Sequence, residues 1–89
     1  MSRHVPRKDR WRSLGPNEYR SEPGHVFFRA GQWFAELHYR ITDPETRVPG
    51  EPETWLAGKF KRPRNAMIAL EDKVTELRRR HGEHVQFSA

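Results

Sequence analysis

Residues 31–41 constrain the fold more than any other stretch, because their side chains alternate with a period of two. The odd positions are occupied by Trp33, Ala35, Leu37, Tyr39 and Ile41, whereas four of the five even positions are polar or charged. Successive side chains of a β-strand point to opposite faces, so this alternation predicts a strand with one buried and one open face. Aromatic and β-branched residues favour such a pleated surface. We therefore expect residues 31–41 to form the central strand.

Shorter strand signals lie on both sides of this central strand. Residues 25–29 are rich in β-prone side chains, and Gly31 suits a tight turn with positive φ between the two strands. Residues 54–60 also alternate and predict a third strand, with Trp55 and Lys59 on one face and Leu56 on the other. The intervening loop, residues 42–53, contains four acidic residues and three prolines, which are turn signals.

A change of period after residue 62 predicts a helix. Met67, Leu70, Val74 and Leu77 recur at steps of three or four residues, the spacing of one helix face. Pro63 fits the first helical turn, where its missing N–H has no partner to lose, and glycine at position 82 fits a C-terminal stop. Residues 84–87 leave open a short edge strand or a trailing end.

Residues 1–24 contain three prolines and little periodicity, and they predict a basic, largely irregular N-terminal arm. Residues 25–89 then form a single β-β-β-α domain. The expected fold class is α+β: a three-stranded antiparallel sheet packed against one C-terminal α-helix, with an extended N-terminal arm. The helix covers one face of the sheet, and the other face is left for solvent, the arm or a partner.

The composition sets the scale of the protein and the class of its partner. The chain has 89 residues, 34% hydrophobic and 33% charged, which predicts one small domain with a thin core. It has no cysteine and no apolar run near the ~20 residues that span a bilayer, so we expect a soluble cytoplasmic protein without membrane contact. The net charge of +5 favours a polyanionic partner.

Two segments resemble a known family of DNA-binding domains. GQWFAELHY, residues 31–39, is similar to the Gly-x-Trp-x-Ala-x-(Val/Ile) strand of AP2-like domains, which include the arm-type domains of phage and transposon integrases. GKF at 58–60 and NAMIAL at 65–70 look like that family's Gly-x-Phe, short turn and alanine-rich helix. The resemblance covers residues 25–81 and implies three strands and a helix, with the open sheet face in the major groove of duplex DNA. Glu36, where the family often has a basic residue, and the long acidic loop depart from this pattern.

The candidate nucleic-acid contacts fall into three groups. On the open sheet face we expect Arg29, Phe34, His38, Arg40, Trp55 and Lys59, since arginine and lysine bind phosphates or base edges and exposed aromatic rings stack on bases. Just before the helix, Lys61, Arg62 and Arg64 are candidate phosphate contacts, because free N–H groups at a helix start attract anions. In the arm, the candidates are Arg3, Arg7, Lys8, Arg10 and Arg12.

Each group has an alternative interpretation. The aromatic residues of the open face are equally consistent with a cover formed by the arm through Trp11 or Tyr19, and the basic run at 59–64 with a solvated charge cluster. The same face can also dock a protein, because aromatic residues and arginine are frequent in protein–protein hot spots.

Catalytic and metal chemistry have little support in the sequence. The five histidines lack a cysteine or clustered carboxylates that would complete a tetrahedral metal site. No glycine-rich phosphate loop or nucleophile elbow is present. We therefore expect a protein that is not an enzyme and has no cofactor and no metal.

Two functions remain as expectations. The first is a small DNA-binding protein, of phage or mobile-element type, that acts as an accessory or regulatory factor on duplex DNA. The alternative is a protein-interaction module or inhibitor that binds a host protein through the same exposed face. Glu36 and the acidic loop favour the alternative, whereas the basic residues at 59–64 and in the arm favour DNA.

Overall fold

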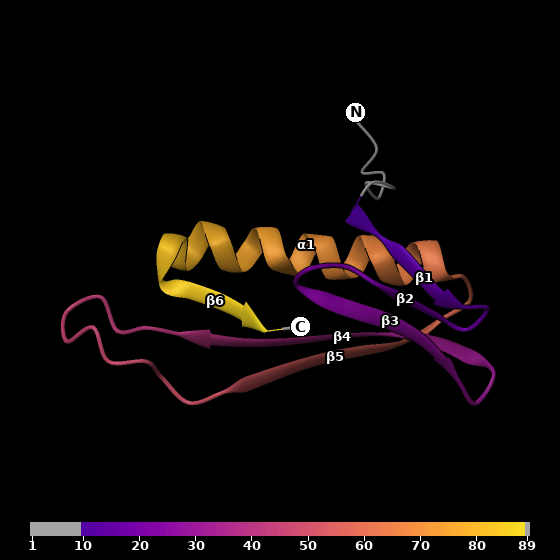
Figure 1. The fold of residues 1–89 in the computed structure, drawn as a ribbon, viewed down its shortest axis with the longest axis horizontal. Coiled ribbons are helices and arrows are strands. Elements are labelled where there is room, and N and C mark those ends of the chain that lie inside the picture. Colours follow the sequence, from indigo (N-terminus) through magenta and orange to yellow (C-terminus); the bar gives the residue numbers. More distant parts are fainter. Residues whose placement is uncertain (1–9, 89) are drawn as a thin grey trace.

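The computed structural model describes residues 10–88, in which an antiparallel sheet lies beneath one long helix (Figure 1). The elements are β1 (Arg12–Gly15), β2 (Glu18–Arg20), β3 (Gly24–Arg29), β4 (Gln32–Ile41), β5 (Glu53–Phe60), α1 (Pro63–His81), a 3₁₀ turn (Gly82–His84) and β6 (Val85–Ser88). No helix within residues 10–88 is long and apolar enough to cross a bilayer.

Strand β4 is the centre of the sheet, which confirms the prediction for residues 31–41. The strand order is β1-β2-β3-β4-β5, and β6 also pairs with β4. Strand β3 pairs with residues 32–37 of β4, β6 pairs with residues 38–41, and β5 runs along the opposite edge. Both edges of β4 are therefore hydrogen-bonded over most of their length, as its mixed aromatic and aliphatic composition favours.

The prediction of a three-stranded sheet is wrong, because the sheet of the described residues has six strands. Residues 12–24, which were assigned to an irregular arm, supply β1, β2 and the first residue of β3. These strands have only four and three residues, and the register of β1 shifts between Ser13 and Gly15. Strands this short show no periodicity in the sequence. They are stabilised by the pairing of β1 with β2 and of β2 with β3 more than by local propensity.

The core lies between α1 and the covered face of the sheet. On α1 the buried residues are Ala66, Leu70, Val74 and Leu77. The buried stripe of the helix therefore begins at Ala66 and not at Met67, as the sequence predicted. They pack against Val26, Trp33, Ala35, Leu37 and Val85 from β3, β4 and β6. Of the two alternatives for residues 84–87, a short edge strand or a trailing end, the structure has the strand. This strand, β6, pairs with β4 and contributes Val85 to the core cluster.

The helix lies close to β3 because Gly24 has no side chain. A Cβ added there would approach the carbonyl oxygen of Glu36 to 2.5 Å and Cδ1 of Leu70 to 2.9 Å. The resulting layer of α1 on one side leaves the other side of the sheet uncovered by any helix of the described residues (Figure 1).

Candidate functional site

The open face, the side of the sheet turned away from α1, is crossed by a row of paired side chains. Arg12 lies opposite Arg20, Arg20 opposite His25, His25 opposite Glu36, and Glu36 opposite Leu56. Residues directly opposite one another in a sheet share a face, so this row runs from β1 to β5. None of the five belongs to the core cluster, which places the row on the uncovered side.

An aromatic pair, Phe27 and Phe34, lies next to this row. The two residues are opposite each other in β3 and β4, their ring centroids are 5.6 Å apart and their planes differ by 16°. The ring of Phe34 also lies over Gly58 of β5, where an added Cβ would collide with it. Both side chains are half-buried. The pair thus has one side resting on the sheet and the rest open to solvent.

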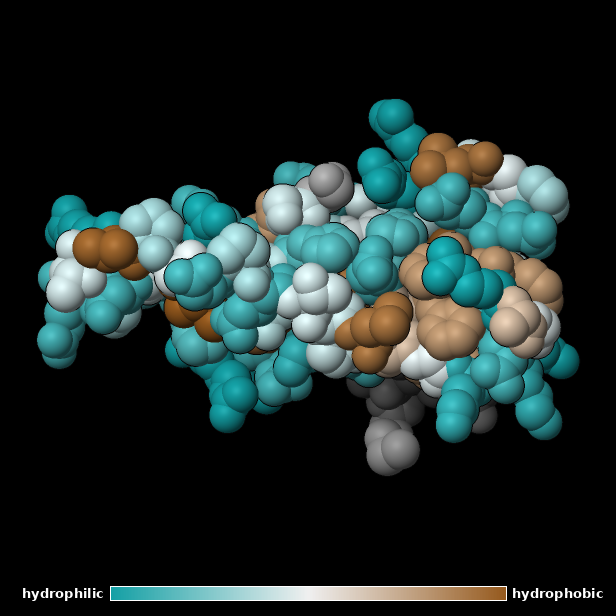
Figure 2. Space-filling view, turned by 90° about the horizontal axis from the view of Figure 1, so that it is seen from below, coloured by the Kyte–Doolittle hydropathy of each residue, from teal (hydrophilic) through white to brown (hydrophobic). Residues whose placement is uncertain are grey.

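Apolar side chains gather on this face around the aromatic pair. Viewed from below, the right half of the molecule shows an apolar group surrounded by hydrophilic surface (Figure 2). Leu56 is 56% exposed and lies on the same face, opposite Glu36. A large exposed leucine next to two half-buried phenylalanines is an apolar patch, and such patches mark interaction surfaces.

Glu36 is held between two histidines. Its Oε1 atom lies 3.3 Å from Nε2 of His25 and 3.2 Å from Nε2 of His38, and Nδ1 of His38 lies 3.0 Å from the hydroxyl of Thr54. The Glu36 carboxylate therefore accepts from both rings when Nε2 carries the proton, and the Thr54 hydroxyl then donates to His38. Among residues 10–88 no group of three or more histidine, cysteine or acidic side chains is arranged to hold a metal ion.

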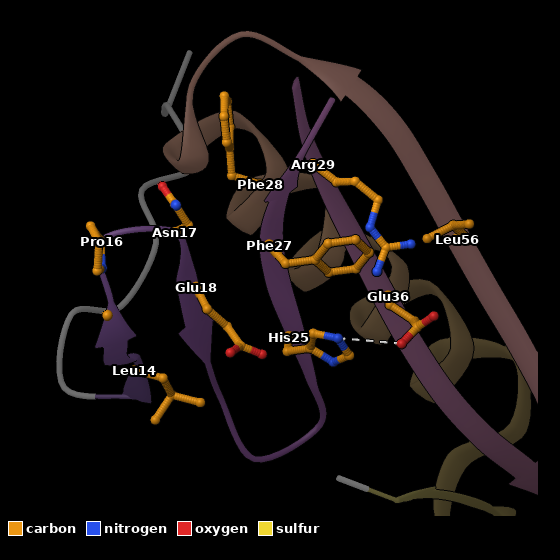
Figure 3. Close-up of a pocket in the computed structure, with 11 residues that line it drawn as sticks. Leu14, Pro16, Asn17, Glu18, His25, Phe27, Phe28, Arg29, Glu36 and Leu56 are labelled. Atoms are coloured by element: carbon orange, nitrogen blue, oxygen red, sulfur yellow. Dashed lines mark ion pairs between the residues drawn. The ribbon is translucent and has the colours of Figure 1, made fainter. Parts of the chain in front are cut away.

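A depression of about 510 Å³ runs between the β1–β2 hairpin and Phe27 of the aromatic pair. Figure 3 shows Leu14 and Glu18 on one side of it and Phe27, Arg29 and Leu56 on the other. The guanidinium carbon of Arg29 lies 5.2 Å from the centroid of the Phe27 ring, within the range of a cation–π contact. The depression therefore has apolar and aromatic walls, one arginine (Arg29) and two carboxylates, those of Glu18 and Glu36.

Four arginines lie on the open face and form no ion pair with another residue of the described part of the chain. They are Arg12, Arg20, Arg29 and Arg40, and all are exposed. Within residues 10–88 the ion pairs formed by arginine and lysine involve only Lys73 and Arg80, both on α1. The four guanidinium groups are therefore available to an external anion.

The basic residues before α1 form a second charged site. Lys61, Arg62 and Arg64 are exposed, and Arg62 is the N-cap residue of α1. Its side chain forms no capping hydrogen bond, and the first turn has no acidic residue. The first N–H groups of the helix are therefore not capped by a side chain, and they reinforce the positive potential of these three residues.

The structure places some of the predicted nucleic-acid contacts on the open face and others elsewhere. The strand registers place Arg29, Phe34, His38 and Arg40 together on the open face. Trp55 lies on the covered face, opposite Leu37, so its predicted position was wrong. Lys59 lies in a bulge with φ of 71° rather than in phase with Trp55. Of the arm candidates, Arg3, Arg7 and Lys8 lie outside the described residues, Arg10 is exposed, and Arg12 belongs to β1.

The bulge explains why Trp55 was misplaced. Between residues 57 and 60, β5 has one residue more than the paired segment of β4, so Ala57 faces Ala35 and Phe60 faces Trp33. Both Trp55 and Phe60 therefore contact the core, although their separation of five residues would put them on opposite faces of a regular strand. A glycine in the interior of a strand often marks a bulge, so Gly58 was the available signal in the sequence.

The arm does not cover the open face through the two residues that were considered for this role. Nε1 of Trp11 donates a hydrogen bond of 2.7 Å to Oε2 of Glu71 on α1. Tyr19 lies opposite Val26 on the covered face, and its ring centroid is 5.8 Å from that of Trp33. Both side chains pack against the core instead.

Sequence reasoning missed three residues of the open face: Arg20, Phe27 and Leu56. Arg20 was hidden in the predicted arm. Phe27 could have been placed from the β3–β4 hairpin register once the turn at residues 30–31 was fixed, since opposite residues share a face. Leu56 lies on β5, and its position depends on the register between β4 and β5.

Comparison with protein-family models, with curated proteins and with solved structures gave no match to this chain. The resemblance to AP2-like domains therefore stays a prediction.

Proposed function

We propose that this protein is a small, non-enzymatic DNA-binding protein that uses the open face of its sheet. The observation that carries the proposal is the set of four arginines on the open face, which form no ion pair with another residue of 10–88. Guanidinium groups neutralise phosphates and donate to base edges in a fixed fork geometry. The basic residues before α1 extend the contact to a second stretch of phosphate backbone.

The pairing of Arg12 with Arg20 supports an anionic partner. The two residues are directly opposite each other in β1 and β2, and like charges in this position destabilise a sheet. A phosphate bound between them would relieve the repulsion. The net charge of +5 acts in the same direction by raising the local concentration of a polyanion.

An accessory or regulatory role of phage or mobile-element type, in the cytoplasm, belongs to this proposal. The support for the role is the resemblance of residues 25–81 to AP2-like and integrase arm-type domains. The support for the compartment is the absence of cysteine from the sequence, which fits a reducing environment.

A second function, protein docking at the same face, is favoured by two exposed leucines. Leu14 is 53% exposed and Leu56 is 56% exposed, and both line the depression. Aliphatic side chains contribute little to phosphate binding, whereas an apolar centre with an arginine rim resembles a protein–protein interface. An interaction module or inhibitor of a host protein would use the depression to take up an apolar side chain.

A titration of labelled DNA against the protein at several salt concentrations tests the first function. Arg20→Ala and Arg29→Ala should each weaken binding and reduce the slope of log affinity against log salt by about 0.7 to 0.9 for each lost phosphate contact. Arg62→Ala and Arg64→Ala should weaken binding to all sequences about equally, since phosphate contacts carry no sequence information.

Arg79→Ala is the matched control, because it removes the same charge from an exposed position in the last turn of α1. It should leave the slope nearly unchanged. If the wild-type protein fails to bind DNA even at low salt, the DNA proposal is wrong. Protein docking would then be tested by pull-down with and without nuclease, comparing the wild type with Leu56→Ser.

A further inference from the structure

The aromatic pair is the part of the open face that phosphate binding does not explain. Phe27 and Phe34 are nearly parallel and half-buried, and they lie at the centre of the face rather than in the core cluster. The His25 ring has its centroid 5.2 Å from that of Phe27, and the Arg29 guanidinium is at the same distance on the other side. Four planar groups thus lie next to one another on the surface.

Planar groups of this kind are stacking partners for bases. Every base has a π-face, and stacking on an aromatic side chain contributes about 1–3 kcal/mol for each base. Within a duplex those faces are covered by the neighbouring base pairs. The planar groups can therefore be used fully only by unpaired bases.

The dimensions of the sheet also disfavour insertion into a duplex. Five strands in the order β1 to β5 span about 19 Å at the usual separation of about 4.8 Å between strands. The major groove is about 12 Å wide and admits a helix or a two-stranded ribbon. In addition, Phe27 lines a depression rather than a ridge, so it cannot project into a groove (Figure 3).

The arginines are placed to hold the backbone of a strand that passes over these rings. Arg29 is on the same strand as Phe27, and Arg12 and Arg20 lie on the next two strands beyond it. The one carboxylate beside the aromatic pair in β4, that of Glu36, is engaged by His25 and His38. Glu18 of β2 lies directly opposite Phe27, so the path from the rings to β1 carries one carboxylate together with the guanidinium groups of Arg20 and Arg12.

We infer that the open face binds single-stranded nucleic acid, with unpaired bases stacked on Phe27 and Phe34 and with phosphates held by Arg12, Arg20 and Arg29. This inference deepens the proposed function and rests on it. Single-stranded DNA and single-stranded RNA share the chemistry that the open face recognises, which is a planar base beside a phosphate.

The experiment measures the anisotropy of a labelled DNA strand of about 12 nucleotides, a length within the usual site sizes of single-strand binders. The same strand annealed to its complement and the RNA strand of the same sequence are the other two arms. The full-length protein is compared with Phe27→Leu and Phe34→Leu, which keep an apolar side chain but remove the ring. Phe87→Leu is the control, because Phe87 packs against the core on the covered face.

We expect the single strand to bind at least tenfold more tightly than the duplex. Phe27→Leu and Phe34→Leu should each weaken single-strand binding by fivefold or more without changing the salt slope, since stacking releases no counterions. Arg20→Ala should change both quantities, and Phe87→Leu neither. The comparison of the DNA and RNA strands then identifies the preferred sugar.

A duplex that binds as tightly as the single strand, with no effect of the two phenylalanine substitutions, would overturn this inference and leave the proposed DNA binding intact. Absence of binding to all three nucleic acids would overturn both. If a phenylalanine variant fails to fold, photo-crosslinking of a 5-iodouracil-substituted strand to the wild-type protein replaces it. A crosslink to Phe27 or Phe34 supports stacking, whereas crosslinks confined to α1 contradict it.

Discussion

The ring of Phe34 occupies the space that a side chain at Gly58 would take. A Cβ built on Gly58 would overlap Cδ1 and Cε1 of this ring. The backbone of Gly58 does not have positive φ, so its requirement for glycine is steric rather than conformational. The absence of one side chain in β5 thus lets an aromatic ring of β4 lie against the sheet.

Gly58→Ala should therefore destabilise the protein by about 1–3 kcal/mol, the usual cost of overpacking. The measurement is chemical denaturation of a double-mutant cycle with Phe34→Ala. In the Phe34→Ala background the alanine at position 58 has room, and its cost should fall below about 0.5 kcal/mol. Equal costs in both backgrounds would show that the ring does not lie over residue 58.

The leucines of α1 should be among the largest contributors to stability. Leu70 is fully buried and Leu77 is 3% exposed, so Leu70→Ala or Leu77→Ala should reduce the free energy of unfolding by roughly 2–5 kcal/mol. Thr75→Ala, at an exposed position of the same helix, is the control and should have an effect within about 0.5 kcal/mol. Thermal or urea denaturation decides between these outcomes, and a small effect at Leu70 would mean that the buried helix face is misassigned.

The buried stripe of α1 and the alternation of β4 could be predicted because each pattern extends over ten or more residues. Leu70, Val74 and Leu77 repeat at helical spacing, and the inward residues of β4 repeat at every second position. Each pattern arises because one element buries one of its faces, so the local sequence alone shows which residues are buried.

Strands β1, β2 and β6 could not be predicted in the same way, because none exceeds four residues. Strand β6 depends on a partner that is distant in sequence, as when Val85 pairs with Ile41, whereas β1 and β2 depend on pairing with the next strand along the chain. The same limit applied to the candidate site. Arg29, Phe34, His38 and Arg40 could be placed from the β3–β4 hairpin, whereas Trp55 was misplaced because a bulge near Lys59 shifts the phase of β5.

Trp11 connects the start of β1 to the helix through its hydrogen bond to Glu71. Trp11→Phe keeps most of the ring but removes the donor, so it should cost about 1.5–3 kcal/mol, the range for a hydrogen bond to a charged group. The cost should shrink in a Glu71→Ala background, because the bond is already lost there. Denaturation of the four proteins of this cycle gives the coupling energy, and a value near zero would exclude the bond in solution.

Burial raises the pKa of the Tyr39 phenol above its ordinary value of 10.0, and the carboxylates of Glu53 and Glu76 raise it further. The fold therefore favours the neutral phenol. Its contribution is fully present below the ordinary pKa and is lost as the pH rises through the folded pKa. Tyr39→Phe should lose less stability than the wild type between about pH 8 and about pH 11.

The sequence has two tyrosines, so the difference between the tyrosinate absorbance of the wild type and of Tyr39→Phe reports the titration of Tyr39 alone. That titration should occur above the usual range for tyrosine and move down in denaturant. A Tyr39 that titrates at its ordinary pKa in the folded protein would show that the phenol is solvated.

Glu36 offers the most direct test of the electrostatics of the open face. Its carboxylate lies on β4 between His25 and His38, on the face where the nucleic acid is proposed to bind. Glu36→Gln keeps an acceptor oxygen and removes a negative charge, so it should strengthen binding to a phosphate backbone, by roughly fivefold for a gain of about 1 kcal/mol. Glu83→Gln removes an equal charge from the exposed 3₁₀ turn beyond α1 and should have little effect.

Anisotropy titrations of both variants at one low salt concentration make the comparison. Weaker binding by Glu36→Gln, with the fold intact by circular dichroism, would mean that the carboxylate is needed to hold His25 and His38 in place for the ligand, and that its charge is not the dominant effect.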